Sequence, residues 1–385
     1  MRLSTKQKVY VGMSGGVDSS VAAALLKKQG FEVHGVFMKP WQPSQGLVTS
    51  GEDVGKQKPL TPDCIWEQDR EDAMRVAAVL DIPLYTWDFS EEYGREVTTY
   101  MVEAYRKGRT PNPDVMCNKE IKFGVFLKKA LAEGADFIAT GHYARVEGSG
   151  QKAVGRETAA YTLRTSVDGN KDQTYFLWTL TQEQLSKTLF PIGDLTKPEV
   201  RKLAKKFRLT TFDKKDSQGV CFIGPLNMRD FLKSYIAPKS GNILDMHGKT
   251  IGKHDGASYY TIGQRHGLNI TLGGGPYLVV SKNIKNNTVT VGKENDLLAN
   301  ATKVTDMHWI GEKPKLPGNL DVKIRYRTKA EPATLQADGT LKFEKSQRAI
   351  TPGQSAVFYK DSAVLGGGII AHYNPKTKIQ GQPLY

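Results

Sequence analysis

The chain has 385 residues, of which 39% are hydrophobic and 24% are charged. This apolar content excludes a wholly disordered protein, and the length favours two or three domains. No apolar run approaches the roughly 20 residues of a membrane-spanning helix, and the first residues lack the apolar stretch of a secretory signal. We therefore expect a soluble, cytoplasmic protein that has no membrane partner.

The charge balance is strongly basic. Lysine and arginine number 54 against 40 acidic residues, so the net charge is +14. A polyanionic partner such as a nucleic acid would explain this surplus, because lysine and arginine bind phosphates and release counterions. A basic enzyme without such a partner remains the alternative.

The first part of the chain alternates strand and helix patterns. Strands are predicted over 8–12, 31–38, 84–89 and 137–140, and helices over 19–29, 66–80, 91–107 and 119–132. Such alternation predicts a parallel sheet with helices on both faces, which binds ligands beyond the carboxyl ends of its strands. Residues 40–63, rich in proline and glycine, are interpreted as a functional lid or a disordered insert.

The pattern changes after about residue 215. Short alternating runs recur from about residue 301, and Asp338-Gly339 separates two of them as a hairpin turn. They predict a small β-barrel or sandwich. We expect three domains: residues 1–218 with the parallel sheet, a small mixed central domain over 219–300, and a C-terminal barrel over 301–385.

The first chemical motif is GMSGGVDS, residues 12–19, between a predicted strand and a predicted helix. Backbone N–H groups at a helix N-terminus bind anions, and glycines let phosphate oxygens approach closely. Asp18 could hold Mg²⁺ or cap the helix. The motif lacks the lysine of a Walker loop and is not G-x-G-x-x-G. An ordinary turn with a good N-cap is the alternative.

The second motif is TPNPDVMCN, residues 110–118. We expect Pro111 and Pro113 to fix an extended loop, with Cys117 just ahead of the helix that begins near Lys119. A helix N-terminus would favour the reactive thiolate. Asp114 could accept a proton from a substrate N–H, or form a hydrogen bond to it. A buried structural cysteine is the alternative.

The other two cysteines differ in context. Cys221, in DSQGVCFI, alone is typical of a core residue, but with Cys117 it becomes a candidate partner thiol. Cys64 lies in PDCIW and suggests no chemistry. The three cysteines form no C-x-x-C pair, so neither a disulfide framework nor a zinc site is expected.

Four further segments carry candidate contacts. Gly141 and His142 follow a strand at the ligand edge of the sheet; Gly141 would admit a nucleotide, and His142 could meet a phosphate or a base. The polar trio Lys171, Asp172 and Gln173 suits ribose and phosphate, or caps a helix. Arg325 and Tyr326, expected on a barrel strand, offer charge and a stacking face for RNA, or a solvated strand face. Gln354 is suggestive only.

Two levels of resemblance follow from these motifs. SGGVDS resembles the PP-loop of the ATP pyrophosphatase superfamily, whose members split ATP between its α and β phosphates. The motifs GMSGGVDSSVAA, TPNPDVMCN, TGHYAR, KDQTYFLW, SQGVCFI and YTIGQRHGL occur here in the order of the tRNA-specific 2-thiouridylase family. The resemblance runs from about residue 8 to about residue 375 and is poorest over 40–63. It implies a Rossmann-like PP-loop domain, a small central domain and a C-terminal β-barrel.

The resemblance also implies the site. ATP with Mg²⁺ would be bound by Gly12, Met13, Ser14, Gly15, Gly16, Val17, Asp18, Ser19, Met38 and Gly141, with no metal held by protein side chains alone. The target base would meet Asn112, Pro113 and Asp114, and tRNA would also contact His142, Lys171, Asp172, Gln173, Arg325, Tyr326 and Gln354.

The implied reaction is 2-thiolation of the wobble uridine, position 34, of the tRNAs for Lys, Glu and Gln. Uracil O2 is adenylated, Cys221 carries a persulfide from a sulfur donor protein, and Cys117 is the nucleophile, giving AMP, pyrophosphate and a disulfide that a reductant reopens. Two alternatives remain: an amidating PP-loop synthetase, and an RNA-binding protein with a relic nucleotide site.

Overall fold

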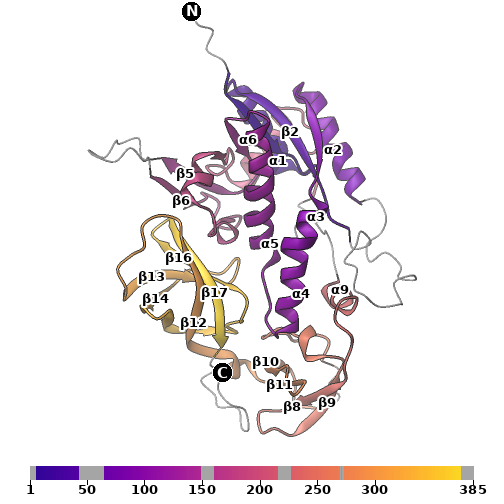
Figure 1. The fold of residues 1–385 in the computed structure, drawn as a ribbon, viewed down its shortest axis with the longest axis vertical. Helices are drawn as coiled ribbons and strands as arrows, with labels where there is room; N and C mark the ends of the chain where they lie inside the picture. The colour runs from indigo at the N-terminus through magenta and orange to yellow at the C-terminus, as the bar shows by residue number, and fades with distance from the viewer. Residues whose placement is uncertain are drawn as a thin grey trace, which may run out of the picture.

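The computed structural model describes residues 6–42, 65–148, 160–215, 227–268, 270 and 273–373. Its strands form three sheets, which lie in separate parts of the molecule (Figure 1). A parallel sheet comes from the first half of the chain, a small mixed sheet from the middle, and a closed barrel from the C-terminal part. The expected fold class is confirmed.

The first sheet has five parallel strands in the order β3-β2-β1-β4-β7. Its strands are β1 (Lys8–Gly12), β2 (Glu32–Lys39), β3 (Leu84–Asp88), β4 (Phe137–Ala139) and β7 (Thr188–Leu189). The strand order reverses direction at β1, so a crevice between β1 and β4 is the expected ligand position. The four strands predicted in this region are confirmed to within one or two residues at their ends.

Helices pack on both faces of this sheet. Val9 and Val11 of β1 belong to the core under α1 (Val17–Lys28), α2 (Ile65–Leu80) and α8 (Lys197–Lys206), whereas Tyr10 faces the opposite core. The second face is covered by two helical runs, each of which contains a π-helical stretch: α3 (Ser90–Tyr93), η2 (Gly94–Thr98) and α4 (Thr99–Arg106), then α5 (Pro113–Met116), η3 (Cys117–Phe126) and α6 (Leu127–Ala132).

The middle sheet has the order β10-β11-β8-β9. Its strands are β8 (Gly241–Leu244), β9 (Thr250–His254), β10 (Leu278–Asn283) and β11 (Thr288–Gly292), preceded by α9 (Met228–Lys233) and accompanied by η5 (Ala257–Tyr259) and η6 (Glu294–Leu297). Phe231 and Val279 belong to the same buried cluster as Tyr105 and Phe126 of the helical layer. The middle sheet therefore shares a continuous core with the first part of the chain.

The C-terminal strands close into a six-stranded antiparallel barrel, because β12 pairs with both β15 and β17. Its strands are β12 (Leu298–Trp309), β13 (Gly318–Lys323), β14 (Glu331–Leu335), β15 (Thr340–Arg348), β16 (Ser355–Lys360) and β17 (Ala363–Tyr373). Gly339 has φ +85° in the turn between β14 and β15, as the predicted Asp-Gly hairpin requires.

A hairpin from the first part of the chain extends this barrel sheet. β5 (Ala144–Gly148) pairs with β6 (Tyr161–Thr165), and β6 pairs with β17 through Arg164 and Ala363. The remaining elements of this region are η4 (Thr174–Phe176) and α7 (Gln182–Ser186). The domain boundaries stay a prediction, but the hairpin shows that the barrel is joined to residues from the first 165. Within the described residues, no helix is long and apolar enough to cross a membrane.

Candidate functional site

The loop of residues 12–19 joins β1 to α1, as predicted. Gly16 is the N-cap of α1, and no side chain caps this helix. Gly15 has φ +72°, and a Cβ there would overlap the carbonyl oxygen of Asp69. The Ser14 and Ser19 hydroxyls lie 3.3 Å apart beside the loop. A helix N-terminus lined by glycine and hydroxyl groups fits a phosphate, since the backbone donors and the helix dipole both favour an anion.

Two other predicted nucleotide residues lie at the same edge of the sheet. A Cβ on Gly12 would come within 3.1 Å of Met38 Cε, at the carboxyl end of β2. Gly141 follows β4, and a Cβ there would lie 2.6 Å from the Ser19 backbone nitrogen. The loop after β1 and the loop after β4 thus meet at the crevice where the strand order reverses. This geometry fits a nucleotide.

The loop motif itself contains no lysine, but a lysine from another part of the chain lies beside it. Lys197 Nζ lies 2.8 Å from both carboxylate oxygens of Asp18, and the Tyr143 hydroxyl donates to Asp18 Oδ1 at 2.9 Å. Asp18 is therefore tied to α8 and does not cap α1. Our reading of the sequence missed Lys197. The Thr196–Glu199 capping box marks the start of its helix, but nothing local indicates that its side chain reaches residue 18.

The second motif forms a helix start, which corrects the extended loop expected from its prolines. Asn112 is the N-cap of α5, and its side chain accepts from Asp114 N at 3.1 Å and Val115 N at 3.3 Å. Pro113 occupies the first turn, where its missing N–H costs nothing. The helix thus begins six residues earlier than Lys119.

This earlier start changes the setting of Cys117. The cysteine lies inside the helical run and is fully buried, and its backbone N–H already donates to the carbonyls of Pro113 and Asp114. The expectation that Cys117 sits just ahead of a helix, with free N–H groups to favour its thiolate, is wrong. Asp114 is half-buried in the first turn, one turn before the thiol.

A series of contacts joins the nucleotide loop to this thiol helix. Gly141 packs on Ser19, and the next residue, His142, lies with Nε2 3.5 Å from Lys122 Nζ and its ring centroid 5.8 Å from that of Phe123. Lys122 and Phe123 belong to η3, which begins at Cys117. The two motifs, separated by about 100 residues, are therefore brought together by the residues that follow β4.

His142 itself is buried and neutral. Burial, and then the charge of Lys122, hold its pKa well below the usual 6.5. Its Nδ1 is 2.8 Å from the hydroxyl of Thr140. Because the ring is already neutral, it need not lose a proton before it forms a hydrogen bond with a base or a phosphate.

The polar residues 171–173 follow β6, and two of their side chains form hydrogen bonds within the protein. The Asp172 carboxylate accepts from the Thr174 hydroxyl at 2.9 Å and from Lys323 Nζ on the barrel at 3.0 Å. Gln173 Oε1 accepts from Tyr143 N at 2.9 Å, and Lys171 is half-buried. Asp172 therefore connects the first part of the chain to the barrel.

The barrel also holds the second motif in place. Thr110 N donates to Pro352 O at 2.8 Å, and Gln354 Nε2 donates to the carbonyls of Thr110 at 2.8 Å and Pro111 at 3.2 Å. The Thr110 hydroxyl is 3.2 Å from that of Thr261, in the middle part of the chain. All three parts of the molecule thus meet at Thr110.

Arg325 and Tyr326 lie in a turn after β13, which corrects the barrel strand expected for them. Arg327 has φ +62°, a conformation that ends an extended run. Arg325 Nη2 donates to Ala349 O at 2.9 Å, and burial lowers the pKa of its guanidinium. The ring of Tyr326 lies 4.4 Å from that of Phe176, whose carbonyl accepts from Asn118 beside Cys117.

Two of the cysteines, and residues 43–63 of the segment interpreted as a functional lid or a disordered insert, lie outside the described residues. Cys64 and Cys221 are among these, so the distance between Cys117 and Cys221 stays a prediction. Among residues that the structure describes, no group of three His, Cys, Asp or Glu side chains could hold a metal ion. The Asp18 carboxylate, a predicted candidate for holding Mg²⁺, is engaged by Lys197.

Three family models match the chain in succession. They are described as a tRNA methyl transferase HUP domain over residues 7–225, a tRNA methyl transferase PRC-barrel domain over 229–293 and an aminomethyltransferase beta-barrel domain over 299–370. A solved structure of an NMN synthetase from Francisella tularensis matches 56% of this chain and 69% of its own, with 16% identity and a TM-score of 0.29, too low to inform the fold.

Curated relatives match nearly the whole chain. A tRNA-specific 2-thiouridylase MnmA from Bacillus cytotoxicus is 45% identical over 379 residues, 96% of each chain. Proteins of the same name from Geobacillus kaustophilus and Lysinibacillus sphaericus are each 46% identical and cover 94% of both chains. The chain therefore belongs to the tRNA-specific 2-thiouridylase family, sulfurtransferases of the PP-loop ATP pyrophosphatase superfamily.

Proposed function

We propose that this enzyme thiolates the wobble uridine, position 34, of the tRNAs for Lys, Glu and Gln at carbon 2, through an adenylated uridine and a cysteine persulfide. The contact of Gly141 with Ser19, followed directly by that of His142 with η3, carries the proposal, since it joins a nucleotide loop to a thiol helix. An enzyme that activates an oxygen with ATP and then replaces it with sulfur needs its nucleotide and its thiol close to the same substrate atom.

In the first step, residues 12–19 bind the triphosphate of ATP at the N-terminus of α1, with Met38 and Gly141 beside the nucleoside. Mg²⁺ carried by the phosphates would neutralise negative charge there. Lys197 neutralises the Asp18 carboxylate at the loop, so that this acid does not repel the phosphates. The base, flipped from the anticodon loop, meets Asn112, Pro113 and Asp114, and its O2 becomes the adenylate with release of pyrophosphate.

In the second step, sulfur replaces this oxygen. A donor protein leaves a persulfide on Cys221, and Cys117 attacks the Cys221 sulfur, so that the S–S bond to the outer sulfur breaks and a Cys117–Cys221 disulfide forms. The outer sulfur keeps the electron pair of that bond and ends on C2, while AMP leaves. A two-electron reductant then reopens the disulfide. Because Cys117 is buried in the free protein, we expect tRNA binding to expose it.

The remaining tRNA contacts surround Thr110. Tyr326 offers a ring beside Phe176, and we expect Arg325, Gln354, His142 and the trio from Lys171 to contact tRNA once its binding has opened the site. The net charge of +14 favours a polyanion over a small substrate. We place the enzyme in the cytoplasm, where its tRNA substrate and a reductant are found.

One assay distinguishes this function from its alternatives. AMP formation should require tRNA, and thiouridine should form only when a persulfide donor or sulfide is added. An amidating synthetase would release AMP without tRNA in the presence of a small acceptor. A binding protein with a relic site would retain tRNA and form no AMP. Either of these last two results would overturn the proposal.

A further inference from the structure

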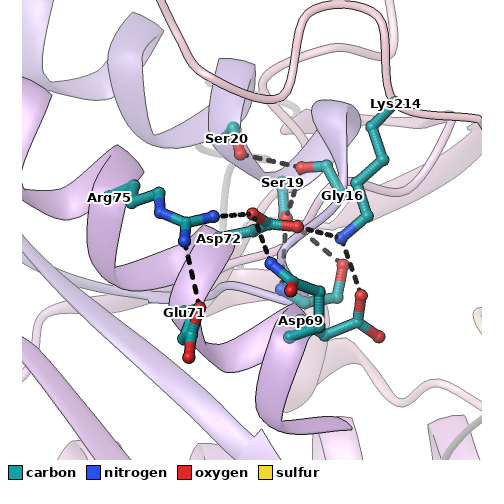
Figure 2. A network of polar contacts seen from close by, with 10 residues as sticks. Gly16, Ser19, Ser20, Asp69, Glu71, Asp72, Arg75 and Lys214 are labelled. Atoms are coloured by element: carbon teal, nitrogen blue, oxygen red, sulfur yellow. Dashed lines mark hydrogen bonds and ion pairs between the residues drawn. The ribbon is translucent and has the colours of Figure 1, made fainter. Parts of the chain in front are cut away.

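Two acids of α2 lie beside the nucleotide loop. A Cβ on Gly15 would overlap the carbonyl oxygen of Asp69, so this turn of α2 packs directly against the loop. Asp72 follows one turn later on the same face of the helix, and Figure 2 shows both acids in one network with Gly16 and Ser19 of the loop. Negative charge at this place would repel a triphosphate unless cations neutralised it.

One lysine pairs with both acids. Lys214 Nζ lies 2.7 Å from Asp69 Oδ1 and 2.6 Å from Asp72 Oδ2 (Figure 2). The backbone that carries this lysine is held separately, because Arg201 of α8 donates to the carbonyls of Phe212 at 3.1 Å and Lys214 at 3.0 Å. A fixed segment therefore brings the ammonium group to the two carboxylates.

The electrostatics of the contact are those of a charged pair. Although burial alone would raise the pKa of Asp72, the hydrogen bond and charge of Lys214 lower it. Burial would lower the pKa of Lys214, but its bonds to the two acids raise it. Arg75 does not replace this lysine, because it is shared between Asp72 at 2.9 Å and Glu71 at 3.0 Å. Lys214 is therefore the cation that the two acids have in common.

The acid inside the loop has a partner from the same part of the chain. Lys197, at the start of α8, lies 2.8 Å from both carboxylate oxygens of Asp18. Arg201 lies one turn further along α8, and Lys214 follows that helix in the chain. Residues 197–214 thus neutralise acids both in the nucleotide loop and beside it.

We propose that Lys214, acting through Asp69 and Asp72, is a positioning residue for ATP, which sets the affinity of the nucleotide loop for the triphosphate. It holds the two carboxylates and cancels one of their charges. Its loss would leave two negative charges beside the loop in place of a net charge of one. This inference rests on the proposed binding of ATP by residues 12–19.

The first measurement is the dissociation constant of ATP with Mg²⁺, determined by equilibrium dialysis on the full chain without tRNA. Lys214→Met should weaken ATP binding at least about tenfold, because it leaves an uncompensated charge near a polyanion. Lys214→Arg, which keeps the charge, should stay within about threefold of wild type. The exposed neighbour Lys215→Met removes the same charge from the same segment and should bind ATP as wild type does.

A second substitution separates neutralisation from a purely structural role. Lys214→Met combined with Asp72→Asn has the net charge of the wild type, so ATP binding should return to within about threefold of it. A structural contact would not be rescued in this way. Asp72→Asn alone should bind ATP as tightly as wild type or more tightly, and this variant decides the question if Lys214→Met does not fold.

Kinetics complete the test. In Lys214→Met the KM for ATP should rise, while the rate of thiouridine formation at saturating ATP stays within about threefold of wild type. Wild-type ATP affinity in Lys214→Met, failure of the double variant to recover, or weaker ATP binding in Asp72→Asn would each overturn the inference. A wild-type protein that binds no ATP would instead overturn the proposed nucleotide site.

Discussion

The two loops that carry the chemistry are held in different ways. Residues 12–19 lie between a strand and a helix that follow one another directly, and the contacts of Ser14, Gly16, Ser19 and Ser20 stay within the loop and the first turn of α1. The loop at Thr110 depends on Pro352 and Gln354, more than 240 positions later. The loop of residues 12–19 is therefore held by its own first turn and by neighbours within the first 200 residues, such as Asp69, Gly141 and Lys197, whereas the loop at Thr110 is held by residues of the barrel part of the chain.

This difference suggests that the two loops act at different steps of the reaction. A local loop can bind ATP before tRNA arrives, because little of its geometry depends on the barrel. The loop at Thr110 can respond to RNA, because Gln354 from the barrel part and Thr261 from the middle part of the chain both contact Thr110. Substitutions in the barrel should therefore affect sulfur transfer more than they affect ATP binding.

The most severe test removes the thiols. Cys117→Ser and Cys221→Ser should each reduce thiolation by at least about 10³-fold, because a hydroxyl cannot replace a thiolate as nucleophile or carry a persulfide. Pyrophosphate release should persist in both, because neither thiol takes part in the proposed adenylation. Thiouridine can be quantified in digested tRNA, and substantial thiolation by either variant would contradict the two-thiol scheme.

The next test changes Gly141, a residue outside the loop of residues 12–19 that packs against it. A Cβ on Gly141 would lie 2.6 Å from the Ser19 nitrogen, so Gly141→Ala should raise the KM for ATP about tenfold or more and lower the free energy of unfolding by about 1–3 kcal/mol. Gly169, with no atom within 4 Å of its Cβ position, provides the matched control. Unchanged ATP kinetics in Gly141→Ala would argue against a nucleotide at this edge.

A third test separates the loops. Gln354→Ala removes two hydrogen bonds to the Thr110 and Pro111 carbonyls, each worth about 1 kcal/mol, so thiolation should fall about tenfold. The KM for ATP should not change. Gln347→Ala, whose amide bonds only a carbonyl two residues away, is the control in the same barrel. Equal effects on ATP binding and thiolation would show that the loops are not independent.

The smallest expected effect concerns pH. Burial keeps the pKa of His142 below 6.5 in the folded protein, so the unfolded chain binds more protons as pH falls through about 6.5. Its contribution to stability is therefore complete above that pH and is lost below it, by up to about 1.4 kcal/mol per pH unit. As the pH is lowered from 8 to 5, the melting temperature should fall less steeply in His142→Asn than in wild type, whereas the exposed His247→Asn should leave the slope unchanged.

The errors in the sequence reading have one cause. The prolines of residues 110–118 predict an extended loop, but the Asn112 side chain supplies the cap that makes Pro113 a suitable first residue of a helix. The alternating run around Arg325 and Tyr326 predicts a strand, yet the contacts of Arg325 with Ala349 and of Tyr326 with Phe176 hold them in a turn. In both cases a polar or aromatic partner outweighed the local pattern.

The sequence by itself determined the parallel strands, the glycine loop after β1 and the alternating strands of the barrel, because hydrophobic period and glycine conformation act over a few residues. Only the tertiary structure decided that Lys197 meets Asp18, that the β5–β6 hairpin joins the barrel and that Gln354 holds Thr110. Those contacts join residues between about 180 and 250 positions apart, and no local pattern encodes the direction in which a side chain finds a distant partner.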